Sequence, residues 1–176
     1  MISIPIYEGD AVDRVCYLRV DHSTGAFEEM NEGDALGRPT LTVGAYSGSR
    51  MVQKVNFING AAANVEYFDV STPEVALEWH SENFAKAIGR AWSSYVRNDS
   101  GSRRVGYVVS NGRRTFGELI IEQLDADDDI LSEERRTPDG QLIERLEYGY
   151  DDDKEIAETR IYGRDGSLIQ LDRHDD

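Results

Sequence analysis

The chain has 176 residues, of which 39% are hydrophobic and 30% charged, with a formal net charge of -15. This composition favours one domain, residues 1–176, and excludes a wholly disordered chain. No apolar run approaches the roughly 20 residues of a membrane-spanning helix, and residues 1–14 lack the basic and apolar regions of a secretion signal. The single cysteine, Cys16, excludes an internal disulfide and a Cys-based zinc site. We therefore expect a cytoplasmic protein that does not bind membranes.

The acidic residues are concentrated in the last third of the chain. Residues 1–115 hold 14 acidic and 12 basic residues, whereas residues 116–176 hold 20 acidic and 7 basic residues. Nucleic acids and anionic membranes would be repelled by this region, because proteins bind phosphates through Lys and Arg. A basic protein would be attracted to it, although acidic residues also serve simply to keep a surface hydrated.

Residues 1–115 are predicted to form an α+β body, in which strands dominate. Short segments rich in β-branched and aromatic residues, bounded by Gly, Asn, Asp or Pro, are typical of strands. The segments that fit this description are 2–7, 14–21, 26–30, 40–46, 51–58, 64–70 and 105–109. Residues 21–25 provide a turn that ends in glycine, and Asn111-Gly112 is the strongest two-residue hairpin signal in the chain.

One principal helix is predicted at about residues 73–97. Ser71 and Glu74 have the spacing of a capping box, and Pro73 suits a first helical turn. Apolar residues then recur at helical spacing, and we expect them to pack against a sheet. These residues are Leu77, Phe84, Ile88, Ala91, Trp92 and Tyr95.

From Phe116 onward the chain repeats a short phrase, Gly-x-Leu-Ile, which begins at Gly117, Gly140 and Gly166. Between the copies, apolar and charged residues alternate with the period of a β-strand, and acidic turn segments separate the alternating stretches. The predicted result is a meander of about five strands, residues 116–176. The fold class is therefore α+β: mostly antiparallel sheet, one principal helix and a C-terminal acidic β-meander.

The tyrosines and turns of this region resemble those of a known repeat family. Tyr148-Gly149-Tyr150-Asp151, Tyr162-Gly163-Arg164-Asp165 and the recurring Asp-Gly-x-Leu-Ile phrase are similar to the YD-type hairpin repeats of bacterial Rhs proteins. They also resemble short repeats in antitoxin-like proteins that accompany polymorphic toxins. The resemblance covers residues 116–173, about a third of the chain. The number of copies is too small for an enclosing shell, so the resemblance implies an antitoxin-like association.

No constellation of residues predicts catalysis. The histidines, His22, His80 and His174, have no partner at a recognisable spacing, and Cys16 lies in an apolar strand without a neighbouring base. His80 with Trp79 and Trp92 could line a cleft between helix and sheet, which leaves a small enzyme or ligand-binding domain as an alternative. We predict no catalytic residue and no cofactor.

The acidic turns are the best candidates for cation binding, although they do not form EF-hands. Asp125, Asp127 and Asp129 alternate as calcium ligands do, but Ile130 and Arg136 stand where the motif needs glycine and glutamate. We therefore predict no metal site, and weak binding of a divalent cation stays open. The neighbouring arginines, among them Arg103 and Arg104, are interpreted as charge partners of the acidic third across the sheet.

These observations predict a non-enzymatic binding protein, in particular an immunity protein or antitoxin that neutralises a basic toxin or effector. Carboxylates of the meander would steer association, and exposed tyrosines would supply contact energy. The expected partner-binding residues are Asp127, Asp128, Asp129, Tyr148, Tyr150, Asp151, Asp152, Asp153 and Tyr162. Two further hypotheses are an acidic nucleic-acid mimic that inhibits a DNA-binding enzyme and a component that self-associates through strand edges. The sequence leaves the oligomeric state open.

Overall fold

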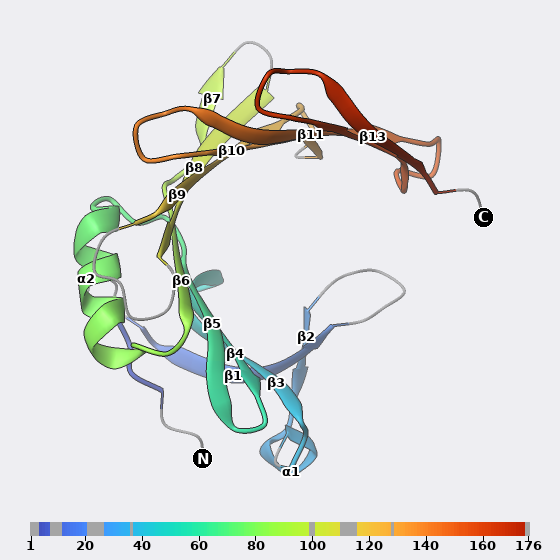
Figure 1. Ribbon diagram of the computed structural model, residues 1–176. Coiled ribbons are helices and arrows are strands. Elements are labelled where there is room, and N and C mark those ends of the chain that lie inside the picture. The colour runs from blue at the N-terminus through green and yellow to red at the C-terminus, as the bar shows by residue number, and fades with distance from the viewer. Residues whose placement is uncertain are drawn as a thin grey trace. The chain divides into compact units, whose positions relative to one another are not determined.

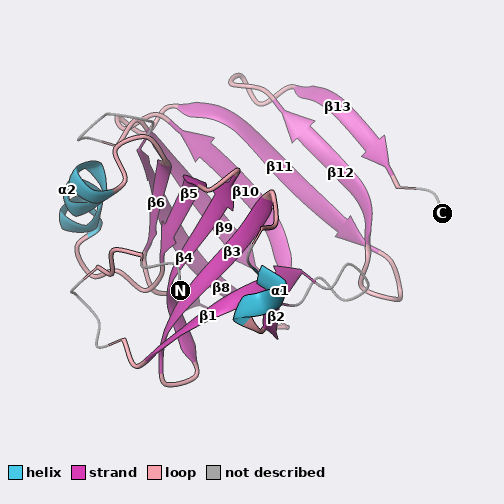
Figure 2. Cartoon of the chain, turned by 90° about the horizontal axis from the view of Figure 1, so that it is seen from below, coloured by secondary structure: helices cyan, strands magenta, loops and turns pink. Residues whose placement is uncertain are grey.

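A computed structural model of the protein describes residues 4–7, 12–20, 27–35, 37–98, 101–109, 116–127 and 129–174. It contains mostly antiparallel sheet and two helices, one of them principal (Figures 1 and 2). The chain divides into two compact units, the first comprising residues 1–92 and 109–115 and the second comprising residues 93–108 and 116–176. Residues 93–108 thus group with the meander and not with the predicted body. The prediction of a single domain is not tested by this division.

Six strands form the sheet of the first unit, in the order β2-β1-β3-β4-β5-β6. Their bounds are Arg14–Val20 for β1, Phe27–Met30 for β2, Thr40–Ser47 for β3, Arg50–Ile58 for β4, Ala61–Tyr67 for β5 and Ile88–Trp92 for β6. Neighbouring strands are antiparallel except for β5 and β6, which are parallel. A short helix, α1 (Glu32–Ala35), follows β2. The predicted strands of the body are largely confirmed.

The predicted strand at residues 2–7 is wrong in its described part, residues 4–7. This segment is irregular because its backbone bonds to a side chain and not to a neighbouring strand. The amide of Tyr7 donates to Gln53 Oε1 at 2.9 Å, and Gln53 Nε2 donates to the carbonyl of Pro5 at 2.9 Å. Gln53 itself is buried. The segment therefore packs as a cover on the sheet.

The principal helix, α2, spans Pro73–Asn83, so the prediction of a helix to residue 97 is wrong. Its start at Pro73 is confirmed, but Thr72 occupies the N-cap position and no side chain caps it, so the predicted capping box does not form. After the helix the chain turns back and forms β6 parallel to β5. The result is a β-α-β connection in which the helix covers one face of the sheet.

Gly89 explains why the helical prediction fails beyond Asn83. A Cβ atom at this position would lie 2.7 Å from His80 Cδ2 and 2.7 Å from Val109 Cγ1, so only glycine lets helix and strand approach this closely. Val55 and Val65, one on each of β4 and β5, are fully buried beside it, and Leu77 of the helix is 1% exposed. The core of the first unit lies between α2 and this face of the sheet.

The second unit is a β-meander whose strands pair in chain order, β8-β9-β10-β11-β12-β13, with β7 on β8. The bounds are Val96–Asn98 for β7, Gly101–Val109 for β8, Glu118–Leu124 for β9, Ile130–Arg136 for β10, Leu142–Tyr150 for β11, Ile156–Tyr162 for β12 and Leu168–Arg173 for β13. All these pairs are antiparallel. The prediction of about five strands after residue 116 is confirmed.

Two copies of the repeated phrase form the same hairpin turn. Gly140 and Gly166 both have positive φ, 87° and 78°, and each donates its amide to the carbonyl three residues earlier. A register shift follows in both hairpins, at Arg135/Arg136 and at Ile161/Tyr162. A turn that closes with a left-handed glycine and a bulge matches the right-handed twist of the strands. The glycine of the phrase is therefore required by the turn itself.

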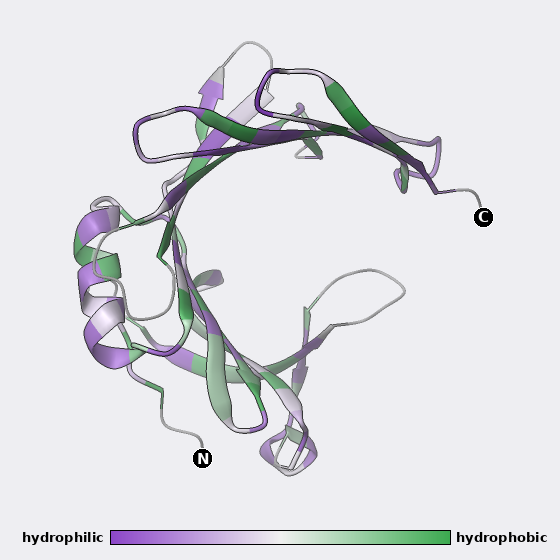
Figure 3. Cartoon of the chain, viewed as in Figure 1, coloured by the Kyte–Doolittle hydropathy of each residue, from purple (hydrophilic) through white to green (hydrophobic). Residues whose placement is uncertain are grey.

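The described residues of the second unit contain no helix, so no helix of that unit covers either face of the meander. Most side chains of β10 to β12 are half-buried on both faces, and hydrophobic and hydrophilic residues alternate along these strands (Figure 3). No helix of the described residues is long and apolar enough to cross a membrane. The predicted turn at residues 21–25 and the Asn111-Gly112 hairpin lie outside the described residues.

Candidate functional site

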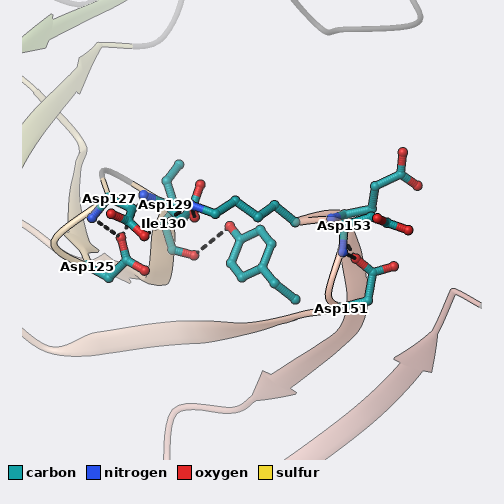
Figure 4. A network of polar contacts seen from close by, with 9 residues as sticks. Asp125, Asp127, Asp129, Ile130, Asp151 and Asp153 are labelled. Atoms are coloured by element: carbon teal, nitrogen blue, oxygen red, sulfur yellow. Dashed lines mark hydrogen bonds and ion pairs between the residues drawn. The ribbon is translucent and has the colours of Figure 1, made fainter.

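Two acidic turns of the second unit lie next to each other although they are far apart in sequence. One turn, residues 125–129, joins β9 to β10, and the other, residues 151–155, joins β11 to β12. Because alternate hairpins of a meander reverse at the same end of the sheet, these two turns share an end (Figure 4). We call them the acidic turn pair.

The two turns have the same internal structure. Asp125 Oδ1 accepts the amides of Asp127 and Asp129 at 2.8 and 3.0 Å. Asp151 Oδ1 likewise accepts the amides of Asp153 and Glu155 at 2.9 and 3.0 Å. In each turn the leading aspartate therefore caps its own backbone, as Asx turns do.

Lys154 joins the two turns. Its Nζ lies 3.1 Å from Asp127 Oδ2 and 3.3 Å from Asp129 Oδ2, and these hydrogen bonds raise the pKa of the lysine. Tyr150 adds a second link, since its hydroxyl donates to the carbonyl of Ile130 at 2.9 Å (Figure 4). The structure thus brings together predicted site residues from both turns.

The acidic turn pair has a large excess of negative charge. One lysine stands among the described carboxylates of Asp125, Asp127, Asp129, Asp151, Asp152, Asp153 and Glu155. Asp152 and Asp153 are exposed, and no hydrogen bond or ion pair to their carboxylates is found within the described part of the chain. Asp128 lies outside the described residues. The unpaired carboxylates are free to meet a partner.

The three tyrosines predicted as exposed contacts are half-buried, so that expectation of exposure is wrong. Burial, and then the charge of Glu133, raises the pKa of Tyr148. The hydroxyl of Tyr162 donates to Glu147 Oε2 at 2.9 Å, and Arg145 lies 4.7 Å from the centre of its ring. The three tyrosine rings pack against neighbouring residues of the sheet, and only part of each ring is exposed to solvent. Their role in partner binding stays a prediction.

The arginines of the second unit neutralise the carboxylates in the middle of the sheet. Arg104 Nε donates to Glu122 Oε2 at 2.6 Å, so the predicted pairing of the arginine cluster with the acidic third is confirmed for Arg104. Arg135 donates to both Glu118 and Glu144, and these hydrogen bonds raise its pKa. The uncompensated negative charge is therefore concentrated at the turns and not along the strands.

His80 lies in the core and not in a cleft. Its side chain is 1% exposed, Nε2 lies 3.2 Å from the carbonyl of Ala87, and Nδ1 lies 3.0 Å from the hydroxyl of Tyr67. Because a carbonyl only accepts, Nε2 carries the proton and Nδ1 accepts from the tyrosine. Burial lowers the pKa of this histidine, which favours the neutral ring.

The tryptophans proposed for the same cleft do not share a face of the sheet. Trp79 packs against Tyr7 and Tyr67 on the side of the helix. Trp92 Nε1 donates to Glu66 Oε2, and Glu66 belongs to the opposite face. The residues named for the enzyme alternative are thus separated. Within the described ranges, no group of three His, Cys, Asp or Glu residues is placed to hold a metal ion.

The sequence predicts most residues of the acidic turn pair, but it does not predict Lys154, the capping role of Asp125 or the contact between the turns. The two turns share a pattern in the sequence that indicates their common structure, an aspartate followed by acidic residues two and four residues later.

Comparison with known proteins adds no relative: no family model, curated protein or solved structure matches this chain.

Proposed function

We propose that this protein is a non-enzymatic binding protein whose acidic turn pair contacts a basic protein. The observation that carries the proposal is the juxtaposition of two acidic turns around a single lysine, Lys154. Asp125 and Asp151 cap the backbone of the two turns, so a partner does not have to order the backbone that carries the other carboxylates. Preorganised charge raises both the rate and the specificity of association.

Asp152 and Asp153 are the strongest candidates for direct contact. They are exposed, and they project from a turn whose backbone Asp151 already caps. Charges at the rim of an interface act mainly on the association rate and on its salt dependence. The half-buried Tyr148 and Tyr150 would contribute the exposed edges of rigid rings, as aromatic residues do at the centres of interfaces.

The type of partner follows from the charge and from the repeats. Residues 116–176 carry 20 acidic and 7 basic residues, which disfavours nucleic acid and favours a cationic protein. The hairpin phrase resembles repeats of antitoxin-like proteins that accompany polymorphic toxins. We propose an immunity protein or antitoxin that acts in the cytoplasm on a basic toxin or effector.

The test begins with the tagged full chain, which is used to capture proteins from a lysate of the organism that encodes it. Washes at low and at high salt are compared, and retained proteins are identified by mass spectrometry. The proposal expects one basic protein, retained at low salt and depleted at high salt. Expression of that protein alone is expected to stop the growth of a bacterial host, and coexpression with this chain is expected to restore it.

Two triple variants then localise the contact. Asp151→Asn, Asp152→Asn and Asp153→Asn together remove three charges from one acidic turn, while the amide oxygen introduced at position 151 can still cap the backbone. The matched control, Glu74→Gln, Glu78→Gln and Glu82→Gln, removes three exposed charges from α2. At low salt the first variant should associate about tenfold more slowly than the wild type, and the control should not. Equal rates for the two variants, or no basic partner even at low salt, would refute the proposal.

A further inference from the structure

The face of the first sheet that is opposite to α2 carries charged residues in a row across three strands. Lys54, Glu66 and Arg90 are paired in register on β4, β5 and β6, so their side chains share one face. Side chains on this row are well shielded, with 16% of Lys54 and 16% of Glu66 accessible. The row lies within the first unit and is separate from the acidic turn pair.

Glu66 is fully engaged by two neighbours. Lys54 Nζ lies 2.9 Å from Glu66 Oε1, and Trp92 Nε1 donates to Glu66 Oε2 at 3.2 Å. Lys54 is also enclosed by aromatic rings, since its Nζ lies 5.5 Å from the ring centre of Phe27 and 5.9 Å from that of Phe68. The carboxylate therefore has one cation and one donor of its own.

Arg90 is left without a counter-ion. Its guanidinium lies 5.4 Å from the centre of the Trp92 ring, and its Nε is buried without a hydrogen-bond partner. No ion pair to Arg90 occurs within the part of the chain that the structure describes. A buried donor that lacks an acceptor is destabilising, and such groups are few in folded proteins. The row thus has two cations and one anion.

A small pocket of about 110 Å³ is lined by Asn64, Val65, Glu66, Ile88 and Arg90. Asn64 stands on the same face as Arg90, because it pairs with Asn56 and Ile88 in the register that places Glu66 beside Arg90. The side-chain amide of Asn64 is a neutral hydrogen-bond donor beside the charged guanidinium of Arg90. The pocket is several times larger than the roughly 10 to 15 Å³ that one water molecule needs, so it has room for a carboxylate group.

We propose that this pocket binds the carboxylate of a small organic acid, with Arg90 as its charged anchor and Asn64 as a second donor. Arginine pairs with carboxylates through two parallel hydrogen bonds, and Trp92 holds the guanidinium plane in place. The net charge of the row is +1, which matches a monoanion and disfavours a phosphate dianion. Ile88 is 44% exposed and supplies an apolar wall at the mouth of the pocket.

The proposal is tested by titrating the full chain with sodium acetate at constant ionic strength and recording ¹⁵N–¹H NMR spectra. The indole N–H of Trp92 and the amides of residues 88–90 are the reporters. Arg90→Gln should weaken acetate binding at least tenfold, and Arg90→Lys should weaken it less because the charge remains while the fork is lost. Arg164→Gln removes an exposed arginine of β12–β13 and serves as the matched control, with unchanged affinity.

Saturable shifts of these reporters in the wild type that are lost in Arg90→Gln and kept in Arg164→Gln support the site. Shifts that rise linearly without saturation, equal affinity in Arg90→Gln and wild type, or phosphate binding as tight as acetate overturn it. Arg90→Lys keeps the charge of the row, so it provides the comparison if the glutamine variant unfolds. Weakening of acetate binding by at least threefold in Arg90→Lys supports the proposal, and unchanged affinity contradicts it.

Discussion

The two units of this protein are stabilised by different means. In the first unit, α2 and the segment at residues 4–7 cover a sheet whose inner side chains are fully buried. In the second unit, Ile120 and Leu124 are the only buried apolar side chains among the described residues. Its strands are connected instead by ion pairs such as Arg104–Glu122 and Arg135–Glu144. The comparison suggests that the first unit depends on burial and the second on cross-strand pairing.

The difference follows from the sequence pattern of the two regions. A strand that packs on a helix needs apolar residues on one face, as Val55 and Val65 provide. A single-layered sheet exposes both faces to water, so its strands alternate apolar and charged residues that are only half-buried. Cross-strand pairs then contribute roughly 0.2 to 1 kcal/mol each. Such a sheet tolerates a dense set of carboxylates, provided that arginines stand opposite them.

The largest expected effect comes from breaking the packing of the first unit. Leu77→Ala removes a side chain that is 1% exposed between α2 and the sheet, and should lower the free energy of unfolding by about 2 to 5 kcal/mol. Urea unfolding monitored by circular dichroism measures the loss. Hydrogen exchange with mass spectrometry should show the greatest acceleration in β4, β5 and β6.

The matched control for that variant lies on the edge strand of the second unit. Leu168 is 53% exposed, and Leu168→Ala should change the free energy of unfolding by no more than about 0.5 kcal/mol. If Leu168→Ala were as destabilising as Leu77→Ala, the contrast between a buried core and a two-sided sheet would be wrong.

The next largest effect is expected from the buried carboxylate of the second unit. Glu122 is 5% exposed, and Glu122→Gln removes the carboxylate charge that pairs with the guanidinium of Arg104. We expect a loss of about 2 kcal/mol, less than the roughly 3 to 5 kcal/mol that breaking a fully buried ion pair costs, because Arg104 retains some access to water. The double variant Arg104→Met and Glu122→Leu should recover most of that loss. Failure of the double variant to recover would show that charge pairing is not what this sheet depends on.

The fold could be predicted wherever a pattern is local. The strands at Thr40–Ser47 and Arg50–Ile58 and the five strands of the meander follow from alternation and turn residues. The helix prediction is wrong after Asn83 because Phe84, Ile88 and Ala91 have helical spacing in the sequence, whereas the chain forms strand β6 at Ile88–Trp92. Gly89 decides between helix and strand, because its close approach to His80 is a tertiary contact that the local sequence does not reveal.

The candidate site could be predicted in its residues but not in its geometry. The acidic turns can be recognised in the sequence. Their contact through Lys154 can be predicted only when the order of the strands in the sheet is known. The exposure of Tyr150 was predicted wrongly because its hydroxyl bonds to the carbonyl of Ile130, a contact 20 residues away in sequence. The sequence does not mark Arg90 as a candidate site residue. That its Nε lacks a hydrogen-bond partner is known only once the positions of the surrounding residues are known.

A smaller effect is expected from pH, and it should arise in the first unit. Burial holds the pKa of His80 below its ordinary value, so the unfolded chain binds a proton more readily than the folded one. The stability that neutral His80 contributes is complete above about pH 6.5, the usual value for histidine, and decreases as the pH falls toward the lower folded pKa. The free energy of unfolding should therefore be lower when measured at about pH 5 than when measured at about pH 6.5.

Hydrogen exchange at the two pH values, corrected for intrinsic rates, checks this expectation. Protection should decrease first around α2 and β6, which contact His80, and not in β11 or β12. The ¹⁵N signals of the ring provide a second measurement, because the protonated Nε2 and the acceptor Nδ1 differ in chemical shift. A ring that titrates at the value of a free histidine would contradict the buried, neutral state.

The smallest effect on stability is expected at Lys154, although it joins the two acidic turns. The lysine and Asp127 are both largely exposed, with 58% and 69% of their side chains accessible, and exposed ion pairs contribute little to folding. Lys154→Gln should leave the urea midpoint unchanged within error, because Asp125 and Asp151 cap the turns without it. Association with a basic partner should nevertheless become faster at low salt, since the variant frees Asp127 and Asp129 and removes a repelling charge. A lowered midpoint together with slower association would mean that the lysine builds the acidic turn pair, and that its geometry, more than its net charge, determines binding.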